Sequence, residues 1–125
     1  MKLRIRDNSI RIRLTRSEVG RFGIDKYIES KIDFGNTALK YGMLWDEGSS
    51  ELTAKMNERT ITVHVPAGMA LEFISTEIVG FQNQCSLSNG ASLFILLEKD
   101  FKCIDGNVLE DETDNYENPL AACKQ

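Results

Sequence analysis

Five positively charged side chains recur at every second position near the start of the chain. They are Lys2, Arg4, Arg6, Arg11 and Arg13. Apolar residues fill the positions between them, and this alternation is typical of strands with one buried face. Asp7-Asn8 separates the two runs, and both residue types tolerate the left-handed backbone of a tight hairpin turn. We therefore expect all five cations on one face of a hairpin, with Arg4 opposite Arg11 and Lys2 opposite Arg13.

Such a cationic face has a cost, because like charges directly opposite each other in a sheet lower stability by up to about 1 kcal/mol per pair. Acidic residues of the C-terminal segment, from Asp105 to Glu117, could compensate it. A bound anion could also do so, because arginine matches the geometry of phosphate and carboxylate oxygens. Solvent and counterions suffice if the face is open. The sequence leaves these three alternatives open.

Other residue types that perform chemistry are present but lack the partners that chemistry requires. His64 is the only histidine, and no serine or cysteine lies at a diagnostic spacing from it. Cys103 and Asp105 form an isolated Cys-x-Asp, which is too little for a metal site. The acidic cluster Glu110–Asp114 lacks the spacing of a calcium loop, and there is no phosphate-binding glycine loop or nucleophile elbow. The sequence predicts no catalytic residue, metal site or cofactor.

The elements that carry the cationic face belong to an internal repeat. A shift of 51 residues aligns Ser9–Phe22 with Thr60–Phe73, and a further slip of two residues aligns Phe34–Tyr41 with Leu87–Phe94. A period near 50 indicates a duplicated supersecondary unit. The face of the second copy that corresponds to the cations is much less basic. It consists of Thr53, Lys55, Asn57, Thr60, Thr62 and His64.

Each copy is predicted to fold as strand-strand-helix-strand-strand, residues 1–45 forming the first and 52–99 the second. Thr15 and Glu18 form a capping box for the first helix, which we expect to end at Gly23. Pro66 suits the first position of the second helix. We therefore predict one α+β domain over residues 1–125. It is a mainly antiparallel sheet curled into an eight-stranded barrel or half-barrel with two short helices, followed by an acidic tail over 104–125.

Bulk composition narrows the function. The chain has 125 residues and a net charge of −4, which argues against a general polyanion binder. The hairpin has no aromatic residue on which bases could stack, which argues against nucleic acid as a partner. No apolar run is long enough for a signal peptide or a membrane span. The three cysteines are widely spaced, and we expect free thiols in a cytoplasmic protein. The oligomeric state is not predicted.

Three segments carry a resemblance to a known family. LRIRDNSIRIRLTRSEV, EKDFKCID and EDETDNYENP resemble a small bacterial protein family that is uncharacterised. The resemblance implies a cytosolic bacterial protein whose tail has a fixed role, consistent with docking on the basic hairpin. The architecture is also similar to the triphosphate tunnel metalloenzymes. Those enzymes open with alternating glutamates, whereas this chain opens with Lys2-Leu3-Arg4, so the metal-binding half of that chemistry is missing.

Together, these features favour a non-enzymatic binding or interaction module. Its cationic face would recognise an anion, carried by a small ligand or a protein partner, or the chain's own acidic tail. The alternative is a small hydrolase or transferase for phosphorylated substrates that uses the same face together with acids such as Glu29 and Glu98.

Overall fold

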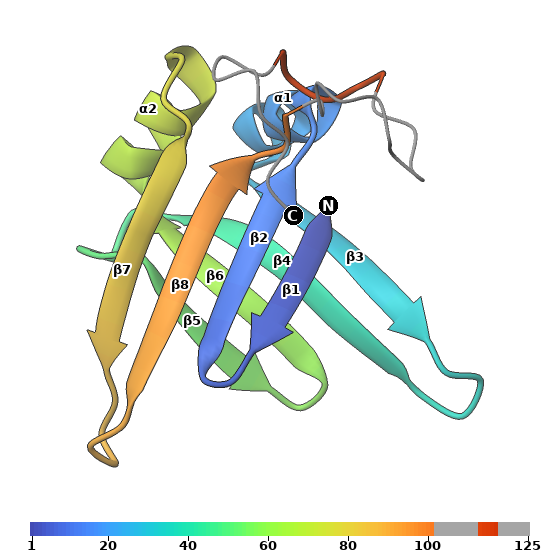
Figure 1. The fold of residues 1–125 in the computed structure, drawn as a ribbon, viewed down its shortest axis with the longest axis vertical. Helices are drawn as coiled ribbons and strands as arrows, with labels where there is room; N and C mark the ends of the chain where they lie inside the picture. Colours follow the sequence, from blue (N-terminus) through green and yellow to red (C-terminus); the bar gives the residue numbers. More distant parts are fainter. Residues whose placement is uncertain (102–112, 118–125) are drawn as a thin grey trace.

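A computed structural model describes residues 1–101 and 113–117, and its strands and helices follow the predicted order (Figure 1). The first copy contains β1 (Lys2–Arg6), β2 (Ser9–Leu14), α1 (Arg16–Asp25), β3 (Tyr27–Asp33) and β4 (Ala38–Asp46). The second contains β5 (Thr53–Asn57), β6 (Thr60–Pro66), α2 (Ala67–Ser75), β7 (Gly80–Ser86) and β8 (Ser92–Lys99). The predicted strand-strand-helix-strand-strand repeat is therefore confirmed.

The strands form two four-stranded sheets that each combine both copies. The first sheet has the order β1-β2-β8-β7, and the second has the order β3-β4-β6-β5. The outer pairs in each sheet are antiparallel hairpins, but the central pairs, β2 with β8 and β4 with β6, are parallel. The sheets are thus mixed, and the prediction of a mainly antiparallel sheet was wrong at the centre of each.

Of the predicted barrel or half-barrel, the closed eight-stranded barrel is also wrong, because the strands form two separate four-stranded sheets. Strands β1 and β7 are the edges of the first sheet, and β3 and β5 are the edges of the second. The second sheet lies behind the first, with its strands crossing those of the first (Figure 1). Each helix carries the chain from one sheet to the other. Period-two alternation reveals which face of a strand is buried, but not which strand will be its neighbour.

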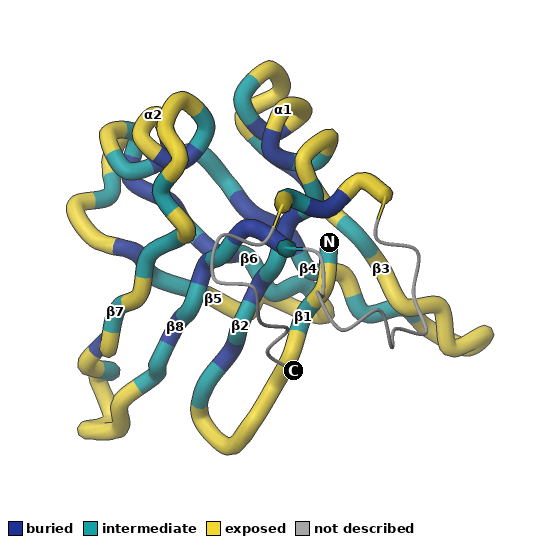
Figure 2. Tube along the Cα trace, turned by 45° about the horizontal axis from the view of Figure 1, so that its top comes forward, coloured by how far each residue is buried: buried dark blue, intermediate teal, exposed yellow. Residues whose placement is uncertain are grey.

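The core lies between the sheets and beneath the helices. Both helices cover the same end of the two sheets (Figure 1), and the buried segments concentrate below them, whereas the hairpin turns at the opposite end are exposed (Figure 2). Phe22 of α1 and Phe73 of α2 are fully buried. They close the core formed by the inward-facing residues of the central strands, such as Ile12 and Val63. This packing fixes which face of each hairpin points outward.

The helix boundaries differ in detail from those predicted. The Thr15–Glu18 capping box is present, and the Thr15 N–H donates to Glu18 Oε1 at 2.8 Å. Helix α1 continues past Gly23 to Asp25, and the left-handed backbone of its C-cap residue, Lys26 (φ 61°), terminates it. Pro66 stands just before α2, as its N-cap, rather than inside the first turn.

Of the predicted acidic tail, Thr113–Glu117 is described, and it contacts the start of α1 and the end of β8. The main-chain carbonyl of Asp114 accepts from the Arg16 N–H at 2.9 Å, and its carboxylate accepts from the Ser17 N–H at 3.2 Å. The Tyr116 N–H donates to the Asp100 carbonyl at 2.7 Å. This short segment therefore caps a helix. The rest of the predicted tail, and with it docking on the hairpin, lies outside the described residues.

Candidate functional site: the cationic hairpin face

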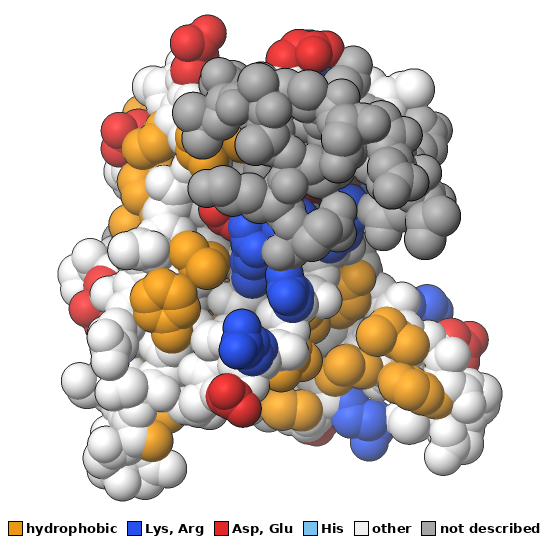
Figure 3. All heavy atoms as spheres, in the orientation of Figure 1, with side chains coloured by type: hydrophobic (Ala, Val, Ile, Leu, Met, Phe, Trp, Pro, Cys, Tyr) orange, Lys and Arg blue, Asp and Glu red, His pale blue; other side chains and the backbone are white. Residues whose placement is uncertain are grey.

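The cationic hairpin face, formed by Lys2, Arg4, Arg6, Arg11 and Arg13, has the predicted geometry. In the antiparallel register of β1 and β2, Arg4 lies opposite Arg11 and Lys2 lies opposite Arg13. The alternating residue Ile12 is fully buried, so the basic side chains point to the outside of the first sheet. Lysine and arginine side chains gather in a column over this hairpin (Figure 3). The structure thus brings together the five basic residues named from the sequence.

Carboxylates from β8 and its end compensate part of this charge. Because β8 runs parallel to β2, Glu98 pairs in register with Arg13, and Asp100 lies just beyond on the same side. The Arg11 Nε–H donates to Glu98 Oε1, and Lys2 Nζ lies 2.7 Å from Asp100 Oδ2 as an ion pair without hydrogen-bond geometry. Compensation from within the chain is therefore real, but in the described residues it comes from the neighbouring strand.

The cations of the face differ in their surroundings. Burial lowers the pKa of Arg13, the charge of Arg11 lowers it further, and Asp100 and Glu98 oppose this shift. By contrast, Arg4 and Arg6 are exposed, and neither forms an ion pair within residues 1–101 and 113–117. Carboxylates therefore neutralise one part of the face, at Arg11 and Lys2, whereas Arg4 and Arg6 on the edge strand β1 present two guanidinium groups to solvent.

The acids of the hydrolase alternative do not gather at this face. Glu98 contacts Arg11, but Glu29 is on β3 in the other sheet, where its carboxylate accepts from the Tyr27 hydroxyl at 2.5 Å. In the part of the chain that the structure describes, no group of three or more His, Cys, Asp or Glu side chains could hold a metal ion. The geometry therefore gives the hydrolase alternative no support.

The remaining chemical candidates are structural or lie outside the described residues. His64 makes an ordinary hydrogen bond on the outer side of the second sheet, with Nδ1 2.8 Å from Asp46 Oδ2. Cys85 is buried and carries a free thiol. Cys103 and most of the Glu110–Asp114 cluster fall in the range that the structure does not describe, although Asp114 itself caps α1.

Sequence reasoning missed Asp100, the most buried acid of the face. Asp100 has only 3% of its surface exposed, and its N–H donates to the Leu14 carbonyl at 2.8 Å, which extends the parallel ladder. Its role depends on β8 lying beside β2, and no local pattern reports that pairing. The repeat comes close to finding it: the slip of two residues places Asp46 on Lys99, whereas the sheet registers require a slip of three and place Asp46 on Asp100.

Comparisons with known proteins agree with the sequence resemblance. Neither the curated proteins nor the solved structures gave a significant match. None of the helices within the described residues is long and apolar enough to cross a membrane. A family model described as "Family of unknown function (DUF7009)" matches residues 1–120, which include both copies of the repeat and the whole cationic face. The chain therefore belongs to this family, DUF7009, whose function is unknown.

Proposed function

We propose that this protein is a non-enzymatic interaction module that binds an acidic protein segment on its cationic hairpin face. The observation that carries the proposal is the contrast within the face. Arg11 is held by Glu98, whereas Arg4 and Arg6 are exposed and form no ion pair in the described residues. Arginine pairs readily with carboxylates in a two-pronged geometry, so these two side chains suit an acidic partner.

The placement on β1 favours an extended polypeptide as the partner. Strand β1 is the edge of the first sheet, and edge strands can pair with an added peptide strand. Side chains on one face of a strand repeat every two residues, which is the spacing of Lys2, Arg4 and Arg6. An extended segment with acidic residues at alternate positions would match this spacing.

The carboxylates beside the cations support the specificity of partner binding as well as the attraction of the partner. Glu98 pairs with Arg11 on β2, and Asp100 pairs with Lys2 on β1, so the two carboxylates limit the repulsion between the strands of the hairpin. The exposed guanidinium groups at the edge remain available. Such an arrangement speeds the encounter with an acidic partner and fixes its orientation more than it increases affinity.

The test measures binding of a fluorescent peptide of alternating glutamate and threonine by anisotropy. The double variant Arg4→Gln/Arg6→Gln should weaken binding by about a hundredfold, because each of the two charged hydrogen bonds contributes about 1.5 kcal/mol. Arg21→Gln is the control, since Arg21 is an exposed cation on α1, away from the hairpin. Arg21→Gln removes one positive charge, whereas the double variant removes two. The affinity of Arg21→Gln for the peptide should stay close to that of the unchanged protein.

The chain's own tail is the competing partner, and the same variants distinguish it. If the tail occupies the face, Arg4→Gln/Arg6→Gln will lower the free energy of unfolding, and the unchanged protein will not bind the peptide. Equal weakening by Arg21→Gln would show a general charge effect and would contradict a dedicated face.

A further inference from the structure

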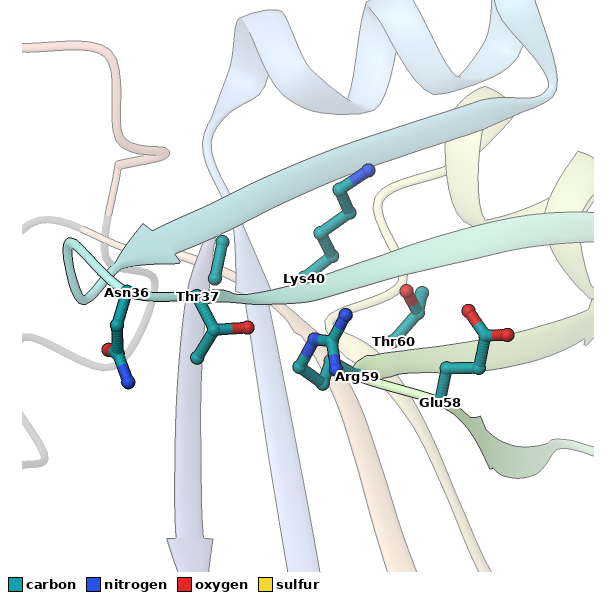
Figure 4. Close-up of a pocket in the computed structure, with 7 residues that line it drawn as sticks. Asn36, Thr37, Lys40, Glu58, Arg59 and Thr60 are labelled. Carbon is teal, nitrogen blue, oxygen red and sulfur yellow. The ribbon is translucent and has the colours of Figure 1, made fainter.

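A polar pocket of about 380 Å³ lies at the turn end of the second sheet (Figure 4). The β3–β4 turn and the start of β4 form one side, and the β5–β6 turn and the start of β6 form the other. The lining residues are Asn36, Thr37, Ala38, Lys40, Glu58, Arg59 and Thr60. Its size is near the lower end of the range for sites that bind small molecules.

The internal repeat provides a control for this pocket within the same molecule. The Lys40 N–H donates to the Arg59 carbonyl at 2.8 Å, and at the equivalent place in the first sheet the Phe94 N–H donates to the Asn8 carbonyl at 3.1 Å. Lys40 therefore corresponds to Phe94, and Arg59 to Asn8, so the alignment of Tyr41 with Phe94 predicted from the sequence was wrong by one residue. Asp7 and Glu58, which begin the two turns, share the same left-handed backbone (φ 49° and 55°).

The two equivalent places differ in whether a side chain bridges the turns. In the first sheet, the Asn8 amide donates to the Ser92 carbonyl and joins the two turns. In the second sheet, Arg59 replaces that asparagine, and no described hydrogen bond from its side chain crosses the gap. The second sheet thus keeps the gap open and places two cations, Lys40 and Arg59, on its walls.

We infer that this pocket binds a small phosphate-bearing molecule. Lys40 and Arg59 form no ion pair within the described part of the chain, so their charges are available to an anion. Thr37, on the β3–β4 turn, and Arg59, on the β5–β6 turn, lie on facing sides of the gap, and the Lys40 side chain extends from β4 toward β3 (Figure 4). A guanidinium group with a nearby hydroxyl donor can satisfy several oxygens of a phosphate group, and the flexible lysine side chain adds a second positive charge.

Glu58 indicates what else the ligand carries. Its side chain lies beyond Arg59, on the side away from Thr37 (Figure 4). A carboxylate only accepts hydrogen bonds, so a group facing it must be a donor. A hydroxyl satisfies this requirement without adding charge, and the ligand class is therefore a phosphorylated polyol. This site is on the second sheet, and it does not depend on the function proposed for the cationic hairpin face of the first.

The test is a titration followed by ¹⁵N NMR at constant ionic strength, with inorganic phosphate and glycerol 3-phosphate as probes and chloride as the reference anion. We expect saturable shifts of the Thr37, Arg59 and Thr60 amides, with a dissociation constant of about 1 mM for phosphate and tighter binding of the ester. Lys40→Gln and Arg59→Asn should each weaken binding about tenfold. Arg21→Gln, an exposed cation on α1, should leave it unchanged.

Both substituted residues are exposed, and an unchanged unfolding midpoint of each variant will show that the fold persists. Thr37→Val adds a neutral variant that should also weaken phosphate binding. The inference is overturned if the shifts rise linearly without saturation, or if they centre on the amides of the hairpin. It is also overturned if Lys40→Gln and Arg59→Asn bind phosphate as well as the unchanged protein does.

Discussion

Asp46 and Asp100 occupy equivalent places in the two halves of the molecule, and each carboxylate contacts a cationic or basic side chain of the adjacent hairpin. Asp46 Oδ2 lies 2.8 Å from His64 Nδ1, and Asp100 Oδ2 lies 2.7 Å from Lys2 Nζ. The sheet registers establish the equivalence, because His64 pairs with Leu44 and Arg13 pairs with Glu98, in each case two residues before the aspartate. The duplicated fold has therefore kept an acid at this place while the basic partners have diverged.

The Asp46–His64 contact should make stability depend on pH in the acidic range. The hydrogen bond with His64, with help from the Gly48 N–H, lowers the pKa of Asp46 below its usual value. Folding thus favours the ionised carboxylate. The stability it contributes is complete above the unfolded pKa of about 3.9 and is lost as pH falls through the lower folded pKa.

Urea denaturation of the unchanged protein and of Asp46→Asn measures this effect. The unchanged protein should have the higher free energy of unfolding at neutral pH, and the difference should shrink steadily below about pH 4. Glu47→Gln, which changes an exposed neighbour, is the control. A difference that stays constant down to the acid limit would contradict the assigned contact.

Neutralising Glu98 should strengthen anion binding while it weakens the fold. Glu98 accepts from Arg11 on the cationic face, so Glu98→Gln releases a guanidinium group for an external partner. We expect affinity for the acidic peptide to rise about threefold and the free energy of unfolding to fall by about 0.5 kcal/mol. Anisotropy and urea denaturation give the two values. Glu72→Gln, an equal change of charge on α2, should alter affinity much less, and an equal gain there would contradict the local role of Glu98.

Strand β7 approaches β8 closely at Gly80. A Cβ atom at this residue would lie 2.0 Å from the Leu97 carbonyl oxygen, so the strands would have to separate. Gly80→Ala should therefore lower the free energy of unfolding by about 2 kcal/mol. Gly68→Ala on α2 is the matched control, because its Cβ would meet nothing within 4 Å, and it should raise stability by about 0.5 kcal/mol. Equal effects of the two variants would contradict the close β7–β8 contact.

Tyr116 holds the segment Thr113–Glu117 against the domain. Its ring lies 5.4 Å from Lys99 Nζ and 5.3 Å from the Arg16 guanidinium, and it packs on Phe101. Tyr116→Ala should lower the free energy of unfolding by about 2 kcal/mol and should speed exchange of the Arg16 amide, which donates to Asp114. Tyr116→Phe keeps the ring and should stay within about 0.5 kcal/mol of the unchanged protein. Slow Arg16 exchange in Tyr116→Ala would show that Tyr116 does not anchor the segment.

The local elements could be predicted well from the sequence because their signals are local. The alternation around Asp7-Asn8 predicted both strands of the first hairpin and the pairing of Arg4 with Arg11. The repeat predicted the order of all elements in the second copy. The prediction that α1 ends at Gly23 failed because glycine permits a helix to end but does not require it. The helix ends instead before Lys26, whose backbone is left-handed.

The assembly of these elements could not be predicted because it depends on contacts between distant segments. The parallel pairing of β2 with β8 places Glu98 beside Arg13, although 84 residues separate the two in the chain. Because strands of one copy pair with strands of the other, the protein forms two open sheets rather than a closed barrel. The pocket at Lys40 and Arg59 depends on two turns from different copies lying side by side. It therefore could not be predicted from the sequence of either turn alone.

The most direct test of the proposed function is a map of where an acidic peptide binds. We predict that titration with the glutamate-threonine peptide, followed by ¹⁵N NMR, shifts the β1 amides most strongly, with the largest changes at Arg4 and Arg6. The Arg4→Gln/Arg6→Gln variant should lose these shifts. Shifts centred on another surface, or equally large in the variant, would contradict the assignment of the hairpin as the recognition face.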